Sequence, residues 1–364
     1  MNTKLKYLLY VGTYSPMELD SIYIYQMDSM TGELEFHKGV KGGENPSYLL
    51  LSPDGRFLYA VNQLVEFQGR PSGAVSAFAI EPLTGELTFL NQQPSHGSGP
   101  CHLTLDRSGQ FLLVANYLGG NLAIFPLSKD GRIEAASQVV QHRGKGRRKE
   151  QDGPHAHFIA AVPSNRFVLS CDLGVDKVIV YQFDTVNGNL LLNSEAMLPS
   201  GSGPRHLDFH PDGRYVYLVN ELNSTMTVLT FNDKTGVIAN IQTLSTLPDG
   251  YAGANSCAEV WAHPSGRFVY GSNRGHDSIV IFAVEAETGQ LSLVGHEPTQ
   301  GKTPRYFVIS PTGSFLLVAN KDSDNVVCFK IDEHTGALGY LQRINVPKPV
   351  CIKFLTAGLG IHHL

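Results

Sequence analysis

A tight turn followed by a short β-rich run stands at His210–Asn220, which reads HPDGRYVYLVN. The same pattern recurs at Ser52–Asn62, which reads SPDGRFLYAVN. Related turns occur at Ser108–Gly109, Asn165, Ser265–Gly266 and Thr312–Gly313. Each turn separates two runs rich in Val, Leu, Tyr and Phe, as a hairpin turn does. The chain is therefore predicted to consist of repeated β-hairpins.

A second turn recurs at the same spacing along the chain. It has the form Thr-Gly-Glu-Leu or a variant of it, and its glycines are 46 to 57 residues apart. The copies lie at Thr31–Leu34, Thr84–Leu87, Asp130–Ile133, Asn187–Leu190, Thr235–Ile238, Thr288–Leu291 and Thr335–Leu338. Self-similarity at a fixed period of this length indicates a repeat architecture.

Each repeat holds four short β-rich runs and no segment of convincing helical period. Four-stranded units at this spacing are typical of a β-propeller, in which blades cover their faces by packing on their neighbours around a central channel. The prediction is an all-β, seven-bladed β-propeller that forms a single domain over residues 1–364. The alternative is two smaller β-domains, and the unbroken repeat through the middle of the chain argues against it.

The two ends of the chain are predicted to share one blade. The last innermost strand is expected at Pro349–Phe354, and its neighbouring second strand at Tyr7–Gly12. Pairing these two strands closes the ring and removes two exposed sheet edges.

Composition and charge exclude several classes of protein. The 28 Lys and Arg residues against 33 Asp and Glu residues give a net charge of −5, which offers no bulk attraction for nucleic acid. No apolar run approaches the roughly 18 residues of a membrane span, and Tyr7–Val11 is shorter than a signal-peptide core. The 5 cysteines form no CxxC pair, which argues against a zinc site or a disulfide framework. A cytoplasmic location is expected, with no nucleic-acid or membrane partner, and a homo-oligomer stays possible.

Aligning the blades with one another identifies one equivalent residue at the start of each innermost strand. These first positions are Ser47, Cys101, His157, Arg205, Ala258, Arg305 and Val350. A second equivalent residue follows the end of the second strand. These second positions are Gln63, Tyr117, Leu173, Glu221, Arg274 and Lys321. Since the two strands are antiparallel hairpin partners, both sets are expected at the same mouth of the channel.

Charged and titratable side chains gather at these positions. Those expected to converge at the mouth are His157, Arg205, Arg305, Glu221, Arg274 and Lys321. The residues that follow the first positions add the candidates His102, His206 and Glu259, whose side chains alternate in direction. A concave polar site with this composition suits an anionic small molecule undergoing acid–base chemistry. A solvated channel wall is the alternative interpretation.

An Asn or Asp ends the second strand in nearly every blade. These residues are Asn62, Asn116, Asp172, Asn220, Asn273 and Asn320. Such recurrence favours side-chain-to-backbone bonds in a turn over a catalytic role.

One junction between blades is longer and strongly basic. Gln141–Asp152 carries Arg143, Lys145, Arg147, Arg148 and Lys149 and is expected to overhang the mouth. It precedes the sequence GPHAH, in which His155 is a further candidate for substrate binding. The loop is interpreted either as a lid that grips a phosphate or as a solvated charged segment.

The pattern resembles the seven-bladed propeller lactonase family over nearly the whole chain. The resemblance rests on GPHAHF at Gly153–Phe158, GPRHLDFHPDGRYVYLVNELNS at Gly203–Ser224, AEVWAHPSGRFVYGSNRG at Ala258–Gly275 and TPRYFVISPTG at Thr303–Gly313. It implies hydrolysis of 6-phospho-D-glucono-1,5-lactone to 6-phosphogluconate in the pentose phosphate pathway, with no cofactor and no metal. The wider group includes muconate lactonizing enzymes, in which a His, a Glu and two Arg at the channel mouth are implicated. They match His157, Glu221, Arg205 and Arg274.

Lactone hydrolysis needs a base for water, stabilisation of the oxyanion and an acid for the leaving oxygen. His157 is the expected proton-handling group, and Glu221 is expected either to orient it or to deprotonate water itself. Arg205 and Arg274 would supply positive charge. Arg305, Lys321 or the basic loop would hold the phosphate.

Three other functions stay open from the sequence. The first is a different lactonase or a muconate-type lactonizing enzyme that uses the same cup. The second is a non-catalytic propeller scaffold that binds proteins. The third is a metal-dependent propeller lactonase, which would need more carboxylates than this channel supplies.

Overall fold

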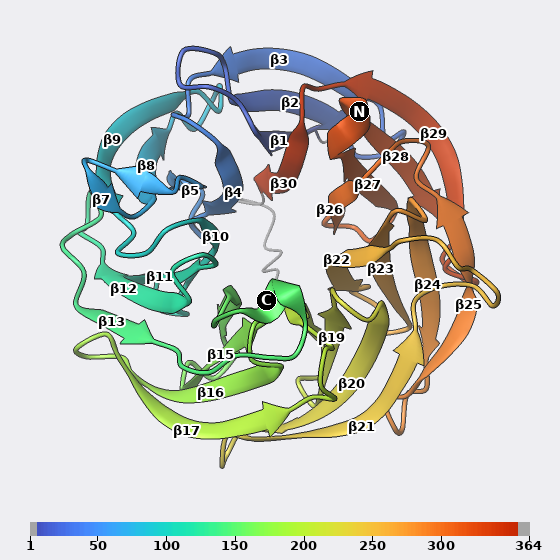
Figure 1. Cartoon of the computed structure of the whole chain (residues 1–364). Helices are drawn as coiled ribbons and strands as arrows, with labels where there is room; N and C mark the ends of the chain where they lie inside the picture. Colours follow the sequence, from blue (N-terminus) through green and yellow to red (C-terminus); the bar gives the residue numbers. More distant parts are fainter. Residues whose placement is uncertain (1–5, 356–364) are drawn as a thin grey trace.

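The apolar runs between the turns form the strands of seven four-stranded antiparallel sheets, arranged as a ring in the computed structural model (Figure 1). The structure describes residues 6–355. We number the blades one to seven by their innermost strands, which line the channel. These strands are β4 (Pro46–Leu51), β10 (Pro100–Leu105), β14 (Ala156–Ala161), β18 (Pro204–Phe209), β22 (Ser256–Ala262), β26 (Pro304–Ile309) and β30 (Pro349–Leu355).

The other strands follow outward within each blade in the same order. The second strands are β5 (Phe57–Asn62), β11 (Phe111–Asn116), β15 (Phe167–Asp172), β19 (Tyr215–Asn220), β23 (Phe268–Arg274), β27 (Phe315–Asn320) and β1 (Lys6–Thr13). The third strands are β8 (Ala74–Ile80), β12 (Asn121–Pro126), β16 (Lys177–Asp184), β20 (Thr225–Asn232), β24 (Ser278–Val284), β28 (Asn325–Ile331) and β2 (Ile22–Asp28). The outermost strands are β9 (Leu87–Pro94), β13 (Gln138–Gln141), β17 (Asn189–Met197), β21 (Val237–Ser245), β25 (Leu291–Pro298), β29 (Leu338–Asn345) and β3 (Leu34–Val40).

Little else interrupts the ring within the described residues. Blade one carries a small extra hairpin of β6 (Glu66–Phe67) and β7 (Arg70–Pro71). Two single-turn 3₁₀ helices, η1 (Lys149–Gln151) and η2 (Lys321–Ser323), complete the regular structure. Across the same residues no helix is long and apolar enough to cross a membrane.

The Thr-Gly turns lie where the sequence predicts them, between the third and outermost strands. Their seven glycines have φ angles between 68° and 83°. This left-handed region is costly for residues with a Cβ atom, which explains why glycine recurs there. The prediction of seven blades is confirmed.

The predicted bonds of the recurrent asparagines are present, with one exception. Asn62 Nδ2 donates to the carbonyl oxygen of Glu44 (2.8 Å), and Asn320 Nδ2 donates to that of Thr299 (2.9 Å). Asn220 differs, because its amide donates to the hydroxyls of Thr225 and Thr227 (2.9 Å each).

The chain closes as predicted, with strands from both ends in blade seven. Strand β1 lies between β2 and β30, and Gly12 pairs with Cys351. Leu9 and Ile352 are buried in the core that spans this junction.

A β-bulge stands at the start of every innermost strand. In blade four, Pro204 pairs with Asn220 and His206 pairs with Val219, so Arg205 is an extra residue without a ladder partner. Equivalent shifts occur in the other blades at Ser47, Cys101, His157, Ala258, Arg305 and Val350. A bulge changes the direction of side chains, so two successive residues of each strand can face the channel.

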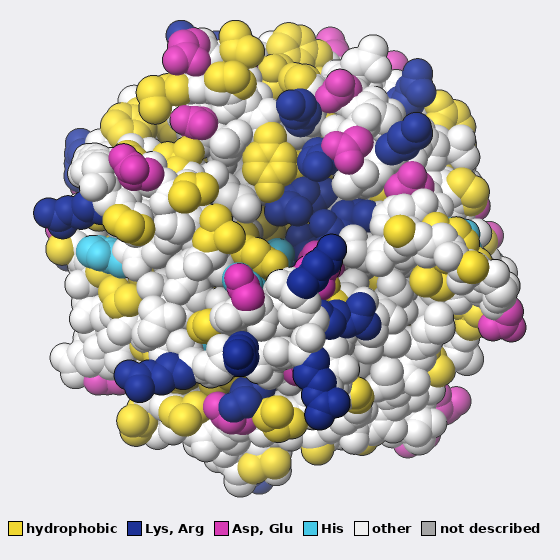
Figure 2. Space-filling model, viewed as in Figure 1, with side chains coloured by type: hydrophobic (Ala, Val, Ile, Leu, Met, Phe, Trp, Pro, Cys, Tyr) yellow, Lys and Arg dark blue, Asp and Glu magenta, His cyan; other side chains and the backbone are white. Residues whose placement is uncertain are grey.

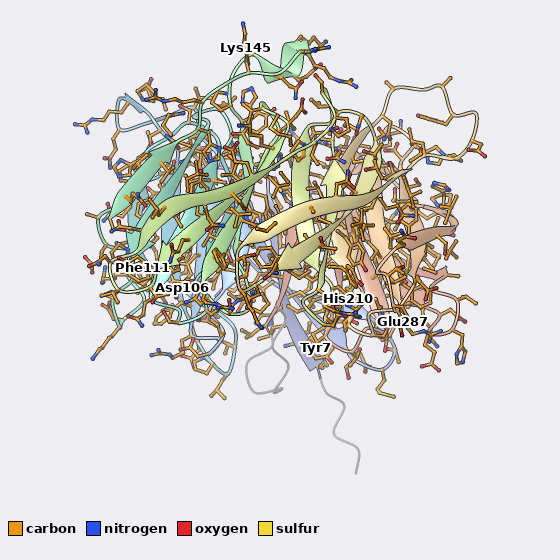
Figure 3. The ribbon with its side chains drawn as sticks, turned by 90° about the horizontal axis from the view of Figure 1, so that it is seen from below. Tyr7, Asp106, Phe111, Lys145, His210 and Glu287 are labelled. Atoms are coloured by element: carbon orange, nitrogen blue, oxygen red, sulfur yellow. The ribbon has the colours of Figure 1, made fainter. Side chains whose placement is uncertain are left out.

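The two faces of the ring differ. The face in Figure 2 carries a central hollow lined by Lys and Arg side chains. In the side view, Lys145 of the basic loop stands above this face, whereas Asp106 and His210 of the hairpin turns lie at the opposite face (Figure 3). The loop therefore lies on the side of the predicted mouth.

We predict that Gly12→Ala destabilises the closure between blades seven and one. A Cβ atom on Gly12 would lie 2.4 Å from the carbonyl oxygen of Pro46 and 3.1 Å from Leu49. Overpacking of this kind costs about 1–3 kcal/mol, which urea denaturation would measure.

Gly295→Ala is the matched control, because a Cβ atom there meets no atom within 4 Å. Its free energy of unfolding should stay within about 0.5 kcal/mol of the wild type. Equal stability of the two variants would contradict the close approach at Gly12.

Candidate active site

An ion-paired cluster lies at the mouth of the channel. Glu221 follows β19, and its Oε2 atom lies 2.8 Å from Arg205 Nε and 2.9 Å from Arg274 Nη2. Arg205 comes from the bulge of β18, and Arg274 ends β23. One carboxylate thus joins guanidinium groups from two neighbouring blades.

Backbone carbonyls fix both guanidinium groups. Arg205 Nη1 donates to the carbonyl oxygen of Ala258, and Arg274 Nη2 donates to that of Cys257 at 2.7 Å. The Arg205 side chain is 2% exposed, whereas the Arg274 side chain is 13% exposed. Arg205 is therefore a buried fixed charge, and Arg274 is the one that reaches the solvent side of the cup.

Glu221 stays ionised in this environment. Burial raises its pKa, but the guanidinium groups of Arg274 and Arg205 outweigh that effect and hold the pKa below its ordinary value of 4.5. A carboxylate held in this way accepts a proton poorly near neutral pH.

His157 is buried beside aromatic rings. Its ring packs edge-to-face against Tyr117 at 5.3 Å and against His206 at 5.1 Å between centroids. Burial, and then the charge of Arg205, lower the pKa of His157 well below 6.5, so the ring is neutral. Its Nδ1 atom lies 3.8 Å from Cys101 Sγ. Burial also raises the pKa of the Cys101 thiol to about 12, which keeps this cysteine from acting as a thiolate.

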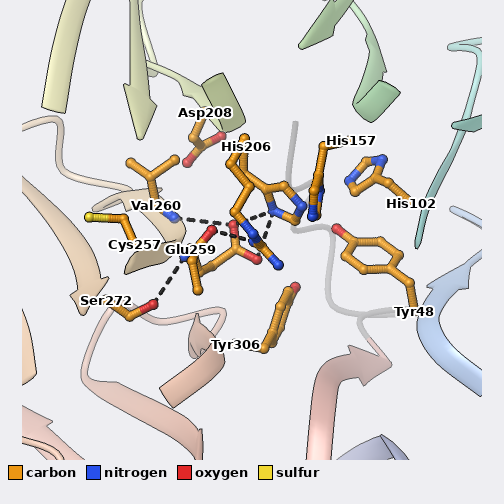
Figure 4. A network of polar contacts seen from close by, with 12 residues as sticks. Tyr48, His102, His157, His206, Asp208, Cys257, Glu259, Val260, Ser272 and Tyr306 are labelled. Carbon is orange, nitrogen blue, oxygen red and sulfur yellow. Dashed lines mark hydrogen bonds and ion pairs between the residues drawn. The ribbon is translucent and has the colours of Figure 1, made fainter. Parts of the chain in front are cut away.

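A buried polar network, called here the buried polar layer, lies next to His157 (Figure 4). It contains His206, Glu259 and His102, each at most 4% exposed. His206 Nδ1 donates to Glu259 at 2.9 Å, and the Val260 amide donates to the same carboxylate at 3.1 Å. The sequence places these three candidates at the mouth of the channel. In the structure each follows a bulged residue by one position, and its side chain belongs to the buried polar layer instead. A direct substrate contact for them stays a prediction.

The far side of this layer holds a cavity of about 130 Å³. Asp208, Trp261 and Lys353 line it from positions three residues after the bulges of blades four, five and seven. Lys353 Nζ donates to the hydroxyl of Tyr306 at 2.7 Å and to that of Tyr48 at 3.2 Å. The channel thus consists of a cup, a buried polar layer and a second cavity toward the opposite face.

The remaining candidates lie around the cup in different settings. Arg305, at the bulge of β26, places its guanidinium over the ring of Tyr14 at 5.4 Å. Lys321 pairs instead with Asp322 (3.1 Å). His155 stacks on Tyr117 at 4.5 Å between centroids and lies 3.1 Å from Asp152, at the base of the basic loop.

Sequence reasoning missed Tyr14 as a residue of the cup. It follows β1 as Gln63 follows β5, and the Tyr14 hydroxyl donates to Gln63 Oε1 at 2.8 Å. The alignment of blades could have found it, but blade seven is split between the two ends of the chain and has no continuous repeat.

Buried polar contacts anchor the basic loop at both ends. His142 Nδ1 lies 2.6 Å from Asp172, and Tyr181 contacts the other ring nitrogen at 2.9 Å. At the far end Gln151 Nε2 donates to Asp176 (2.8 Å) and to the carbonyl oxygen of Leu173 (2.8 Å). The loop is therefore a fixed platform whose cationic side chains are exposed.

No metal centre is evident in the described part of the chain. Residues 6–355 contain no group of three or more His, Cys, Asp or Glu side chains arranged to hold a metal ion.

Comparisons with known proteins find similarity over nearly the whole chain. The family model described as "Lactonase, 7-bladed beta-propeller" matches residues 8–354. The 6-phosphogluconolactonase of Bacillus subtilis is 36% identical over 96% of this chain and 99% of its own length. The 6-phosphogluconolactonase of Formosa agariphila is 35% identical over 83% of this chain and 86% of its own. A periplasmic gluconolactonase of Pseudomonas aeruginosa is 32% identical, covers 96% of this chain and 99% of its own, and superposes with a TM-score of 0.90.

We predict that Glu259 makes the stability of the protein depend on pH. Burial raises its pKa from 4.5 to about 7. A carboxyl group whose pKa is raised by folding stabilises the folded state below its unfolded pKa, and that contribution is lost as the pH rises through about 7. Between about pH 5 and pH 8 the wild type should lose up to about 3 kcal/mol more stability than Glu259→Gln.

Urea midpoints at each pH would measure this difference. Glu134→Gln, at an exposed glutamate, is the control and should follow the wild type. The same pH dependence in the wild type and Glu259→Gln would show that Glu259 does not change its protonation in this range.

Proposed function

Because the chain belongs to the seven-bladed β-propeller lactonase family, we propose that it is a carboxylic ester hydrolase that converts 6-phospho-D-glucono-1,5-lactone to 6-phosphogluconate. This reaction belongs to the pentose phosphate pathway. Relatives in Bacillus subtilis and Formosa agariphila carry the name of this activity. The observation that carries the proposal is the composition of the cup. The neutral imidazole of His157 lies close to the guanidinium groups of Arg205 and Arg274, which share a single carboxylate, that of Glu221.

His157 is proposed as the proton-handling group. It takes a proton from water as the water oxygen bonds to the lactone carbonyl carbon, and the carbonyl becomes an oxyanion. The ring C–O bond then breaks, and His157 returns the proton to the leaving oxygen. From the sequence, either His157 or Glu221 can be the general base that deprotonates water. The neutral imidazole and the firmly ionised carboxylate favour His157.

Arg274 is proposed to stabilise the oxyanion, since it is the more exposed guanidinium of the ion-paired cluster. Arg205 acts from below as a fixed positive charge, already oriented by Glu221 and by a backbone carbonyl. Charges that are oriented before the reaction need no reorganisation as the oxyanion develops.

A lactonase assay tests the substrate class. Freshly generated 6-phosphogluconolactone, corrected for spontaneous hydrolysis, should be consumed faster than D-glucono-1,5-lactone, and muconolactone should react slowest. A preference for muconolactone would favour the muconate-type alternative on the same fold. No turnover of any lactone would favour a binding scaffold.

We propose the cytoplasm as the site of this reaction. All five cysteines are buried and unpaired, as expected where thiols stay reduced. A homo-oligomer, and the absence of nucleic-acid and membrane partners, stay predictions from the sequence.

We predict that His157→Gln lowers kcat by about 100-fold or more, because glutamine keeps a polar side chain but cannot carry the proton. Steady-state kinetics with the phosphorylated lactone would measure this, with circular dichroism to verify folding. His334→Gln, at an exposed histidine, is the control and should be unchanged. Turnover within about fivefold of the wild type in a folded His157→Gln variant would eliminate the proposed role.

We predict that Arg205→Met and Arg274→Met each lower kcat by about 100-fold, the effect of losing a fixed partner of the oxyanion. Methionine fills much of the same volume without the charge. Arg343→Met, on the exposed outer strand β29, is the matched control. If both cup variants fold and keep full activity, the reaction does not take place at this mouth of the channel.

A further inference from the structure

The positive charges in the cup outnumber the negative ones. Three guanidinium groups, those of Arg205, Arg274 and Arg305, occupy the cup, and Glu221 is the carboxylate that pairs with the first two. Within residues 6–355 the Arg305 side chain makes no ion pair and no hydrogen bond: its guanidinium lies over the ring of Tyr14, and Glu221 and Glu259 act on its charge only from beyond contact distance. The cup therefore carries an excess of about two positive charges near neutral pH.

Arg305 is positioned as an anion receptor. It is partly buried at the bulge of β26, and its guanidinium lies over Tyr14, whose hydroxyl is fixed by Gln63. A guanidinium has five N–H donors in a planar fork. Removing such a charge from water without an acceptor is unfavourable, so a ligand that supplies acceptors gains both charge pairing and hydrogen bonds.

We propose that Arg305, supported by Tyr14 and Gln63, binds the phosphate group of the substrate. This inference rests on the proposed function and adds to it the residue that selects phosphorylated lactones. A phosphate monoester carries about −1.5 to −2 charges at neutral pH, which matches the excess in the cup. The planar fork of arginine can bind two phosphate oxygens at once.

The order of residues around the ring fits a substrate with its two reactive groups at opposite ends. His157 belongs to blade three, and Arg205 and Arg274 belong to blades four and five. Arg305 and Tyr14 belong to blades six and seven, the next two around the ring, so that Arg305 adjoins blade five and Tyr14 lies farther round the channel. The lactone carbonyl can therefore lie toward blades three to five while the phosphate lies toward blades six and seven.

The basic loop is the competing phosphate site. Its side chains Arg143, Lys145 and Arg147 are exposed and make no ion pairs in the described structure. Exposed charges are screened strongly at physiological ionic strength, whereas buried ones are screened much less. The loop is therefore suited to attracting an anion toward the mouth, and Arg305 is suited to holding it.

Phosphate binding at Arg305 also affects His157. The charge of Arg305 is one of the causes, after burial, Arg205 and His206, that lower the pKa of His157. A phosphate paired with Arg305 offsets that charge and makes the imidazole a better base. Binding of the phosphorylated substrate would therefore improve the chemistry as well as the affinity.

The test is Arg305→Met, assayed with 6-phosphogluconolactone and with D-glucono-1,5-lactone. We expect KM for the phosphorylated lactone to rise about 10- to 100-fold, the loss of a charge-assisted bidentate contact. For the unphosphorylated lactone, kcat/KM should not fall by more than about threefold, because loss of the Arg305 charge removes no contact to that substrate and also makes His157 a better base. Lys330→Met, on the exposed surface of β28 in the same blade, is the matched control and should leave both substrates unaffected.

Isothermal titration with inorganic phosphate gives a readout that does not depend on catalysis. Wild-type protein should bind phosphate, and Arg305→Met should bind it at least about tenfold more weakly. If the wild type hydrolyses no phosphorylated lactone, the proposed function fails, yet weaker phosphate binding by Arg305→Met would still support the anion site.

Three outcomes would overturn the inference. The first is an equal loss on both lactones, which would place Arg305 at the lactone end or in a structural role. The second is unchanged phosphate binding in Arg305→Met. The third is loss of the phosphate preference at physiological salt in a loop variant that combines Arg143→Ser, Lys145→Ser and Arg147→Ser.

Discussion

Each innermost strand begins with a bulge in which one residue has no partner in the ladder. A regular strand would direct alternate side chains toward the neighbouring blades. The bulge instead allows two successive residues to face the channel. This explains how Arg205 can enter the cup while His206, the next residue, lies in the layer below and bonds to Glu259. The separation of cup and buried layer depends on this one backbone irregularity.

Closure of the ring is the second constraint on the site. His157, Arg205 and Arg274 come from three blades, and Arg305 and Tyr14 from two more. No blade contributes enough groups to bind or hydrolyse a lactone by itself. The pairing of β1 with β30 joins the last blade to the first and fixes the distances across the cup. The proposed reaction therefore requires the complete ring, which links the stability of the closure to function.

Repetition made much of the fold predictable. The glycines of the Thr-Gly turns follow from backbone geometry, so their spacing indicates the blade count directly. Aligned repeats also identified the equivalent residues at the start of each innermost strand, because each blade uses the same backbone there, but they did not reveal that these residues are bulges. Tyr14 was not predicted as a site residue because its blade is split between the two ends of the chain. The buried position of His206 was not predicted because the bulge before it has no sequence signature. Contacts between blades, such as those of Lys353 with Tyr48 and Tyr306, depend on packing that one repeat cannot reveal.

The excess positive charge in the cup follows from a compromise between stability and binding. A second carboxylate beside Arg305 would neutralise the cup and stabilise the unbound protein, but it would also repel a phosphate. Tyr14 supports the guanidinium through its ring face, which offers attraction without a negative charge. Glu221 pairs with the other two arginines, and in the proposed reaction this pairing holds them in place before an oxyanion develops. With the roles proposed above, the cup pairs the charges assigned to the reacting carbonyl and leaves unpaired the charge assigned to the phosphate.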